Sequence, residues 1–362
     1  MNPSPPLTVP GVRTRKRVLV VDDSAFSRRA LRRMIERSPD LDVIATAANG
    51  EEAMRIVLRD KPDVITLDIE MPVMDGFAFL RWLMATRPTP VIVVSARDDD
   101  PSILKAFDLG AVDFIGKPTA RASEEIAAIS DDLLEKIYAV AGLDAAKVSR
   151  RLEPGPPPSQ ASGAVSFPRD LEVVALGAST GGPPAVQAIV TRLKPSFPAA
   201  LIVAQHMPAG FTRQFADRLA SLSRVSVREA VEGEKINPRT VYVAPGGKHL
   251  GIERIRGGLR TRLTEQGKDA HYVPSVDHLM RSAAEACGPR SAGVVLTGMG
   301  NDGAAGLSAI RAAGGVTIAE SEATAVIYGM PREAARVGAA MHVLDLPEIV
   351  EQIGLIGESV NR

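Results

Sequence analysis

A serine in a short glycine-rich turn is the residue of this sequence best placed for nucleophilic chemistry. Residues 177–182 read Gly-Ala-Ser-Thr-Gly-Gly, after an apolar run at 173–176 and before a helix-period segment at 185–193. The pattern Gly-x-Ser-x-Gly between a strand and a helix is typical of a nucleophile elbow, where a sharp turn exposes the serine hydroxyl above a sheet. Ser179 would be that serine. The same residues also suit a loop that binds phosphate at a helix N-terminus.

Two further strand ends carry the groups that such a serine needs. His206 follows the apolar run 200–204, and Asp302 lies in the glycine-rich loop 298–303 after the run 292–296. A serine hydroxyl becomes a strong nucleophile when a base takes its proton and a carboxylate fixes the tautomer of that base. Ser179, His206 and Asp302 are therefore a candidate triad. Their order along the chain differs from the Ser-Asp-His order of α/β-hydrolases, so that fold is not assigned.

Each member of the triad also has a purely structural interpretation. Ser179 suits a helix cap, His206 a strand-end histidine and Asp302 a turn residue. His278 beside Asp277 is a rival base, but it lies within a helical pattern. Nucleotide binding is disfavoured, because it requires Gly-x-Gly-x-x-Gly after the first strand and an acid at the end of the second. Neither requirement is met by this sequence.

The N-terminal part of the chain carries a second set of polar residues at the ends of apolar runs: Asp22, Asp23, Asp68, Ser95 and Lys117. The carboxyl ends of parallel strands meet at one edge of a sheet, where ligands bind. Two like charges 4 Å apart repel by about 4 kcal/mol at an effective dielectric constant near 20. Mg²⁺ with oxygen ligands removes that repulsion. An aspartate beside Mg²⁺, a lysine and a hydroxyl is suited to accept a phosphoryl group, whereas each acid alone suits a cap or loop.

Strands and helices alternate along both parts of the chain. This alternation, with strands that are apolar throughout, predicts parallel sheets covered on both faces and thus an α/β protein of two domains. The second domain also shows an antiparallel hairpin over 249–253 and 259–264. We expect domains at 17–140 and 170–358, a disordered lead-in at 1–16 and a Pro/Gly-rich linker at 141–169. A Pro-rich recognition motif is the alternative for that linker.

Composition narrows the cellular setting. The 43 basic residues balance the 43 acidic residues, so bulk charge indicates neither a nucleic-acid nor a membrane partner. Cys287 is the only cysteine, which excludes an internal disulfide and fits a reducing compartment. No run approaches the roughly 18 apolar residues of a membrane span, and residues 1–16 lack the apolar core of a secretory signal. We expect a cytoplasmic protein without membrane insertion.

The first domain resembles the receiver domains of bacterial response regulators at Asp22-Asp23, Asp68, Ser95 and Lys117-Pro118. The resemblance implies a flavodoxin-like sheet with strand order 2-1-3-4-5. It implies that a histidine kinase supplies the phosphoryl group and that Asp68 accepts it. Ser95 and Phe114 would then be the switch residues, with Lys117 beside them. Mg²⁺ would be held by Asp22, Asp23, Asp68 and the backbone of Glu70.

The second domain resembles the catalytic domain of the chemotaxis protein-glutamate methylesterases at 177–182, 205–208, 210–213, 274–277, 296–303 and 329–333. The resemblance implies Ser179 as nucleophile, His206 as base and Asp302 as the residue that orients it. It also implies hydrolysis of glutamate γ-methyl esters on chemoreceptors, deamidation of glutamines, and no cofactor for hydrolysis.

Two mechanistic expectations follow. The oxyanion requires donors, for which the backbone N–H of Thr180 and of the 298–300 loop near Met299 are candidates. The receiver would cover the catalytic crevice until Asp68 is phosphorylated. The competing class is a phosphorylation-controlled binding module whose second domain is inactive.

Overall fold

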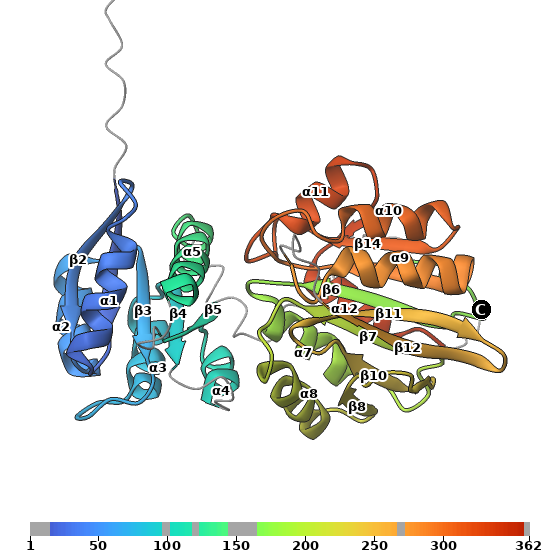
Figure 1. Cartoon of the computed structure of the whole chain (residues 1–362), viewed down its shortest axis with the longest axis horizontal. Coiled ribbons are helices and arrows are strands. Elements are labelled where there is room, and N and C mark those ends of the chain that lie inside the picture. Colours follow the sequence, from blue (N-terminus) through green and yellow to red (C-terminus); the bar gives the residue numbers. More distant parts are fainter. Residues whose placement is uncertain (1–14, 96–101, 118–122, 144–164, 266–271, 358–362) are drawn as a thin grey trace, which may run out of the picture.

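The protein consists of two α/β domains that lie side by side (Figure 1). The computed structural model describes residues 15–95, 102–117, 123–143, 165–265 and 272–357. Nearly all of the expected lead-in, Pro118 and residues 144–164 of the expected linker lie outside the described residues. Val165 is buried, and its backbone N–H donates to the side chain of Gln352, so the chain already contacts the second domain at this residue.

The first domain is a five-stranded parallel sheet with helices on both faces. Its strand order β2-β1-β3-β4-β5 confirms the order implied by the receiver resemblance. The central strands β3 and β4 are buried at every position, as expected for a sheet covered on both faces. The strands are β1 (Lys16–Val21), β2 (Leu41–Ala47), β3 (Val64–Asp68), β4 (Val91–Ser95) and β5 (Asp113–Gly116), and the helices are α1 (Ala25–Ile35), α2 (Gly50–Asp60), α3 (Gly76–Thr86), α4 (Ser102–Asp108) and α5 (Ser123–Val140).

Three helices of this domain begin at a side chain that caps their free N–H groups. The side chains of Ser24, Asn49 and Asp75 accept hydrogen bonds from the backbone three residues further on. Each cap directly follows the loop at a strand's carboxyl end. The loops that carry the acidic residues are therefore anchored at both ends.

The second domain contains a seven-stranded parallel sheet with the order β15-β14-β13-β6-β7-β10-β8. Its centre is formed by β13, β6 and β7, whose residues are all buried. The strands are β6 (Val173–Ala178), β7 (Ala200–Gln205), β8 (Ser226–Glu229), β10 (Thr240–Val243), β13 (Ser291–Val295), β14 (Val316–Glu320) and β15 (His342–Leu344), and the helices are α7 (Gly182–Arg192), α8 (Phe211–Leu222), α9 (Val276–Cys287), α10 (Ala304–Ala312), α11 (Met330–Arg336) and α12 (Leu346–Gly354).

A small antiparallel sheet packs on this domain and confirms the predicted hairpin. Strands β11 (Lys248–Ile255) and β12 (Gly258–Glu265) pair in the register Ile252↔Thr261, and β9 (Lys235–Ile236) joins the edge of β12. The inner face of the hairpin packs against α9 through Leu250 and Ile252. The hairpin therefore holds α9 in place.

Cys287 ends α9 in the core, with 3% of its surface exposed. Burial raises the pKa of its thiol to about 11. Because the thiolate is the reactive form, we expect a disulfide reagent to modify the native protein at pH 8 about 100-fold more slowly than the unfolded protein. Ellman's assay with and without denaturant measures the two rates. Equal rates would contradict a thiol sealed in the core.

Candidate active site

Ser179 lies in the tight turn between β6 and α7, at the carboxyl end of a central strand. Its backbone N–H donates to the carbonyl of Thr297 at 3.0 Å, and its carbonyl accepts the N–H of Gly182 at 2.7 Å. Gly181 adopts φ 74°, a left-handed conformation that glycine adopts without strain. The turn therefore reverses the chain within three residues and leaves the Ser179 side chain at the edge of the sheet, only partly buried.

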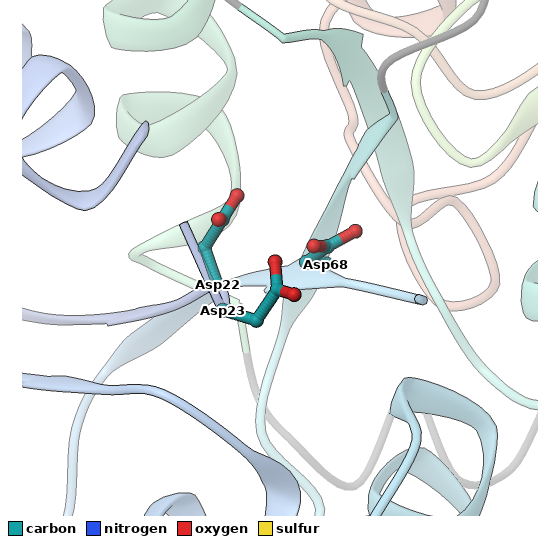
Figure 2. Close-up of side chains that lie close together, drawn as sticks. All are labelled: Asp22, Asp23 and Asp68. Atoms are coloured by element: carbon teal, nitrogen blue, oxygen red, sulfur yellow. The ribbon is translucent and has the colours of Figure 1, made fainter. Parts of the chain in front are cut away.

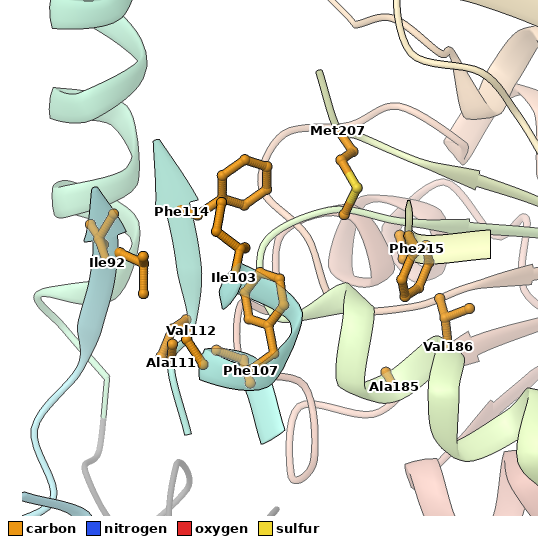
Figure 3. Packing of buried hydrophobic residues seen from close by; sticks show 14 of the residues in the cluster. Ile92, Ile103, Phe107, Ala111, Val112, Phe114, Ala185, Val186, Met207 and Phe215 are labelled. Atoms are coloured by element: carbon orange, nitrogen blue, oxygen red, sulfur yellow. The ribbon is translucent and has the colours of Figure 1, made fainter. Parts of the chain in front are cut away.

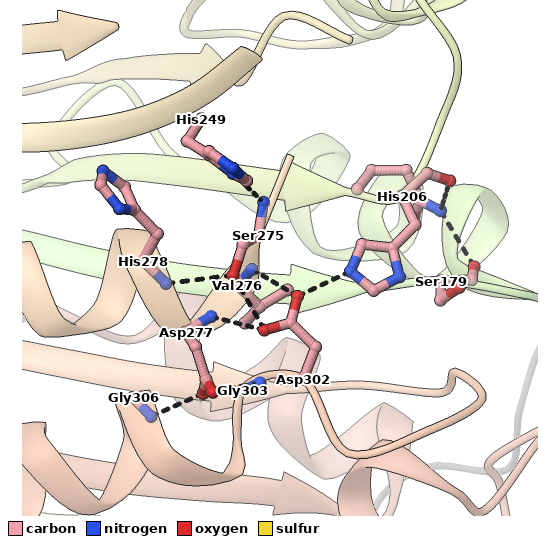
Figure 4. Close-up of polar contacts among 11 residues, drawn as sticks. Ser179, His206, His249, Ser275, Val276, Asp277, His278, Asp302, Gly303 and Gly306 are labelled. Atoms are coloured by element: carbon pink, nitrogen blue, oxygen red, sulfur yellow. Dashed lines mark hydrogen bonds and ion pairs between the residues drawn. The ribbon is translucent and has the colours of Figure 1, made fainter. Parts of the chain in front are cut away.

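His206 and Asp302 meet in a hydrogen bond between Nε2 of the imidazole and Oδ2 of the carboxylate, 2.8 Å apart (Figure 4). His206 directly follows β7, and Asp302 lies in the loop between β13 and α10. Figure 4 shows Ser179 on the side of the imidazole away from Asp302. No hydrogen bond between the Ser179 hydroxyl and the imidazole is present among the described residues. The three predicted side chains thus come together at one edge of the sheet, with Nδ1 as the ring nitrogen left for the serine.

Asp302 is buried and closely held by the start of α9. Its carboxylate accepts the N–H groups of Val276 and Asp277 at 2.7 and 2.8 Å and the Ser275 hydroxyl at 3.0 Å. Burial alone would raise the pKa of Asp302, but the His206 hydrogen bond and charge, together with these N–H donors, lower it below its usual value. The carboxylate therefore stays ionised near neutral pH and can stabilise a protonated imidazole.

The loop at 298–300 packs directly against the serine. A Cβ placed on Gly298 would lie 2.8 Å from the Cβ of Ser179, so no larger residue fits there without a shift. The N–H of Gly298 is already donated to the carbonyl of Ile327. Of the expected oxyanion donors, Thr180 is buried beside the nucleophile and Met299 is half-buried in this loop. Because the N–H of Gly298 is engaged, the N–H groups of Thr180 and Met299 remain the candidates for this role.

The rival base His278 lies on α9, and its ring contacts His249 at a centroid separation of 5.3 Å. In Figure 4 both rings lie beyond Ser275, on the other side of Asp302 from Ser179. Burial lowers the pKa of each of these two histidines. They line a polar pocket of about 600 Å³ together with Tyr272, Arg281, Glu285 and Asp302. His278 is therefore far less suited than His206 to take a proton from Ser179.

Tyr272 was not singled out by sequence reasoning, yet it stacks on the imidazole of His206. The ring centroids are 4.8 Å apart and the planes are within 9° of parallel. Its hydroxyl lies against Gly300, where a Cβ would approach it to 2.1 Å. The only signal in the sequence is its position two residues before the motif at 274–277. Tyr272 thus covers one face of the His206 imidazole.

The acidic cluster of the first domain lies at the carboxyl ends of β1 and β3 (Figure 2). Asp22, Asp23 and Asp68 each offer a carboxylate oxygen within 4.8 Å of the others. Nζ of Lys117 lies 2.6 Å from Asp68 and 3.2 Å from Asp22, and the N–H of Glu70 donates to Asp68 at 3.3 Å. Burial raises the pKa of Asp68 to about 6, against the opposing effect of Lys117. These oxygen ligands and the cost of their burial fit a hard divalent cation such as Mg²⁺.

The two expected switch residues lie on adjacent strands beside this cluster. Ser95 ends β4, and its carbonyl accepts the N–H of Lys117 at 2.6 Å. Phe114 lies on β5 and is buried. Its ring packs against Phe107 of the same domain and against Phe211 of the second domain, with a centroid distance of 4.4 Å to the latter. Phe114 therefore reaches from the neighbourhood of the acidic cluster into the domain interface.

The receiver-like domain docks on the serine turn itself. The carbonyl of Val112 accepts the N–H of Gly181 at 3.1 Å, and the Thr180 hydroxyl donates to Asp113 at 2.5 Å. Apolar side chains of α4 and β5 pack beside those of α7 and α8 (Figure 3). At the rim, Arg218 of α8 and Asp108 of α4 form an ion pair of 2.6 Å. The residues next to the serine are thus held by the other domain.

A receiver fold with an acidic cluster, docked on an α/β domain with a Ser–His–Asp arrangement, defines a response regulator with a hydrolase-type output domain. Residues 18–129 match the response regulator receiver domain model, and residues 174–353 match the CheB methylesterase model. The chain belongs to the family of protein-glutamate methylesterases/protein-glutamine glutaminases.

Two relatives of this family cover nearly the whole chain. "Protein-glutamate methylesterase/protein-glutamine glutaminase 3" of Geobacter sulfurreducens is 47% identical over 94% of this chain and 98% of its own length. A relative of the same name, numbered 2, from Nitratidesulfovibrio vulgaris is 42% identical over 93% and 98%. A solved structure of the Thermotoga maritima CheB methylesterase catalytic domain is 39% identical, covers 52% of this chain and 98% of that chain, and has a TM-score of 0.49.

Proposed function

We propose that this protein is a phosphorylation-activated serine hydrolase that removes methyl groups from glutamate γ-methyl esters of chemoreceptors and deamidates specific glutamines. The observation that carries this proposal is the alignment of Ser179, His206 and Asp302 at one sheet edge, with the His206–Asp302 hydrogen bond already formed at 2.8 Å. The names of the relatives supply the ester and amide substrates. The output would be adaptation in chemotaxis.

In the proposed reaction, Ser179 attacks the ester carbonyl while His206 takes the hydroxyl proton at Nδ1. The imidazole then gives that proton to the departing methanol. Water then attacks the acyl-enzyme with His206 as base, and the imidazole returns the proton to the Ser179 oxygen as its bond to the acyl group breaks and the free carboxylate leaves. Asp302 keeps the Nε2–H tautomer in place and stabilises the imidazolium through the charge that its lowered pKa preserves. The N–H groups of Thr180 and Met299 would stabilise the oxyanion.

Regulation is proposed to act through the docked receiver. Val112 and Asp113, at the start of its β5 strand, bind the two residues that follow the nucleophile, so a chemoreceptor segment and the receiver would compete for the same edge. Phosphorylation of Asp68 by a histidine kinase would add about −1.5 to −2 charge beside Lys117. The new charge would draw Ser95 and Lys117 towards the phosphoryl group. Phe114 would then move away from Phe211 and loosen the interface.

Mg²⁺ would be held by Asp22, Asp23, Asp68 and the backbone carbonyl of Glu70. When bound, the ion would neutralise charge on the incoming phosphoryl group. Lys117, which already contacts Asp68 and Asp22, would supply a further positive charge to the same group. Hydrolysis itself would need no cofactor. We place the protein's action in the cytoplasm, where the expected kinase and the methylated segments of the receptors would meet it.

No helix in the described ranges is both long enough and apolar enough to cross a membrane.

The direct test is methanol release from a methylated chemoreceptor preparation by the purified full chain, with and without a small acyl phosphate and Mg²⁺. We expect release in both cases and a faster rate with the phosphodonor. No release under either condition, from a chain whose Asp68 is demonstrably phosphorylated, would favour the inactive binding module.

Tyr272 offers a test of how the base is held. We expect Tyr272→Ala to lower kcat by about 3- to 10-fold, since a stacked aromatic pair contributes about 0.5–1.5 kcal/mol. Tyr272→Phe keeps the ring and should stay within about twofold of wild type. Steady-state methanol release gives both values. A Phe variant as slow as the Ala variant would assign the effect to the hydroxyl near Gly300 and not to the stacking.

The rim ion pair offers a test of the docked state that leaves both sites untouched. Asp108→Arg would place two guanidinium groups together, because Arg218 lies 2.6 Å from Asp108. We expect the unphosphorylated variant to hydrolyse ester about 3- to 10-fold faster than wild type, a change of about 0.7–1.4 kcal/mol in the docking equilibrium. The swap Asp108→Arg with Arg218→Asp restores the attraction and should restore the low rate. A swap that stays fast would argue against this pair as a docking contact.

A further inference from the structure

Gln205 is a buried amide that contacts the main chain of two predicted catalytic residues at once. It is the last residue of β7, with 2% of its surface exposed. Its Nε2 donates to the carbonyl oxygen of Ser179 at 2.9 Å and to that of His206 at 3.2 Å. The nucleophile's turn and the residue that carries the base are thereby joined through a single nitrogen.

The orientation of this amide is fixed by its surroundings. If it were turned over, Oε1 would face two carbonyl oxygens with no proton between them, which is strongly unfavourable. In the observed orientation Oε1 points towards Gly182, where an added Cβ would lie only 2.2 Å away. Among the described residues Oε1 has no hydrogen-bond partner. An unsatisfied buried acceptor costs about 1–3 kcal/mol. The stabilisation that offsets this cost must come from the two hydrogen bonds that Nε2 donates.

Backbone contacts between the same two segments are few. The N–H of His206 donates to the carbonyl of Ala178 at 3.0 Å, which ends the pairing of β6 with β7. Beyond that point the Ser179 turn bends away from the sheet, while His206 continues towards Asp302. The side chain of Gln205 connects the two segments where they separate, because it binds the carbonyl groups of both Ser179 and His206. Its two bonds fix how far the Ser179 turn lies from the His206 backbone.

We propose that Gln205 is a positioning residue that sets the separation of the nucleophile and the base. The inference rests on the proposed function, because it concerns the serine–histidine pair of that reaction. Gln205 does not reach the substrate itself, since both of its protons are donated to the main chain. Gly182 belongs to the same device, because its missing side chain leaves the room that the amide oxygen occupies.

The first test is Gln205→Met in the full chain, assayed for methanol release with acyl phosphate present. Methionine has a similar length but no donor. We expect kcat to fall about 30- to 100-fold, as for a misplacement of reacting groups by about 1 Å, with KM within about twofold. The matched control is Gln352→Met, which also removes a side-chain bond to the backbone but lies on α12, outside the candidate site, and should keep kcat within about twofold.

The second test is Gln205→Glu, followed across pH. A buried carboxyl group has a raised pKa, and its protonated form can still donate one hydrogen bond to a carbonyl. Its ionised form would repel both carbonyl oxygens. We expect kcat/KM of this variant to fall as pH rises through an ionisation absent from wild type. Because the variant is compared with itself across pH, this test holds even if Gln205→Met fails to fold.

The outcomes are separable. Wild-type kcat in Gln205→Met, or a wild-type pH profile in Gln205→Glu, would overturn the positioning role and leave the proposed function standing. A wild-type chain that releases no methanol when phosphorylated would overturn the proposed function and this inference with it. A lower kcat at constant KM, with the additional ionisation, supports both.

Discussion

Replacing Ser179 with alanine should abolish ester hydrolysis, with a fall in kcat of about 10⁶-fold, the loss that follows removal of a nucleophile from a serine triad. The oxygen that attacks the carbonyl is removed from the turn beside His206. The residual rate would come from the oxyanion donors and substrate binding alone. Methanol release from methylated receptors, measured over hours, provides the necessary range.

Ser308→Ala is the matched control for this change. Ser308 is a partly buried serine whose hydroxyl donates to the helix carbonyl of Ala304, away from the site. It should keep full activity. Both variants should still take up phosphate at Asp68, which verifies that their receiver domain is folded. Retained hydrolysis in Ser179→Ala would remove the serine mechanism. Hydrolysis lost in both variants would indicate damage to the fold.

Replacing Asp68 with asparagine should abolish activation by acyl phosphate. In wild type we expect the phosphodonor and Mg²⁺ to raise the rate at least about tenfold, which needs a shift of about 1.4 kcal/mol in the docking equilibrium. Asparagine removes the acceptor oxygen, so the rate should stay at its low basal value with or without the donor. Rates of methanol release with and without donor give the ratio directly.

The control for the second prediction is Asp42→Asn on β2, an exposed aspartate of the same domain that lies outside the acidic cluster. It should be activated like wild type. Chelation of Mg²⁺ should reproduce the Asp68→Asn result in wild type and change nothing in the variant. An Asp68→Asn protein that still responds to acyl phosphate would show that phosphorylation acts elsewhere.

Much of the fold could be predicted from local pattern. Continuous apolar runs gave the parallel strands, because a strand buried on both faces has no polar side to show. The receiver's strand order came from the resemblance, since periodicity says nothing of which strands are neighbours. Not predicted were β9 and β15, with two and three residues, and helices α11 and α12. Strands this short have no measurable period and form only because neighbouring strands pair with them.

The site divides in a similar way. Ser179, His206 and Asp302 could be proposed because they follow strands that end at a common edge, and their chemistry is complementary. Tyr272 and Gln205 could not, since one acts by stacking and the other by binding two carbonyl groups. Such contacts depend on distances between distant segments. Coverage of the crevice by the receiver could be expected from a phospho-acceptor domain joined to a hydrolase by a short linker, but no pattern in either domain indicates which residues of the two faces meet.

Because β5 of the receiver contacts the serine turn, a substitution on either side of this contact affects how well the two domains dock. A receiver transplanted from a distant relative would still fold and accept phosphate, because those properties reside within it. If it lacked acids at the positions of Asp113 and Asp108, it would not bind Thr180 or Arg218 in this way. In such a chimera the receiver would not inhibit the hydrolase, and a cell carrying it would demethylate its receptors regardless of stimulus.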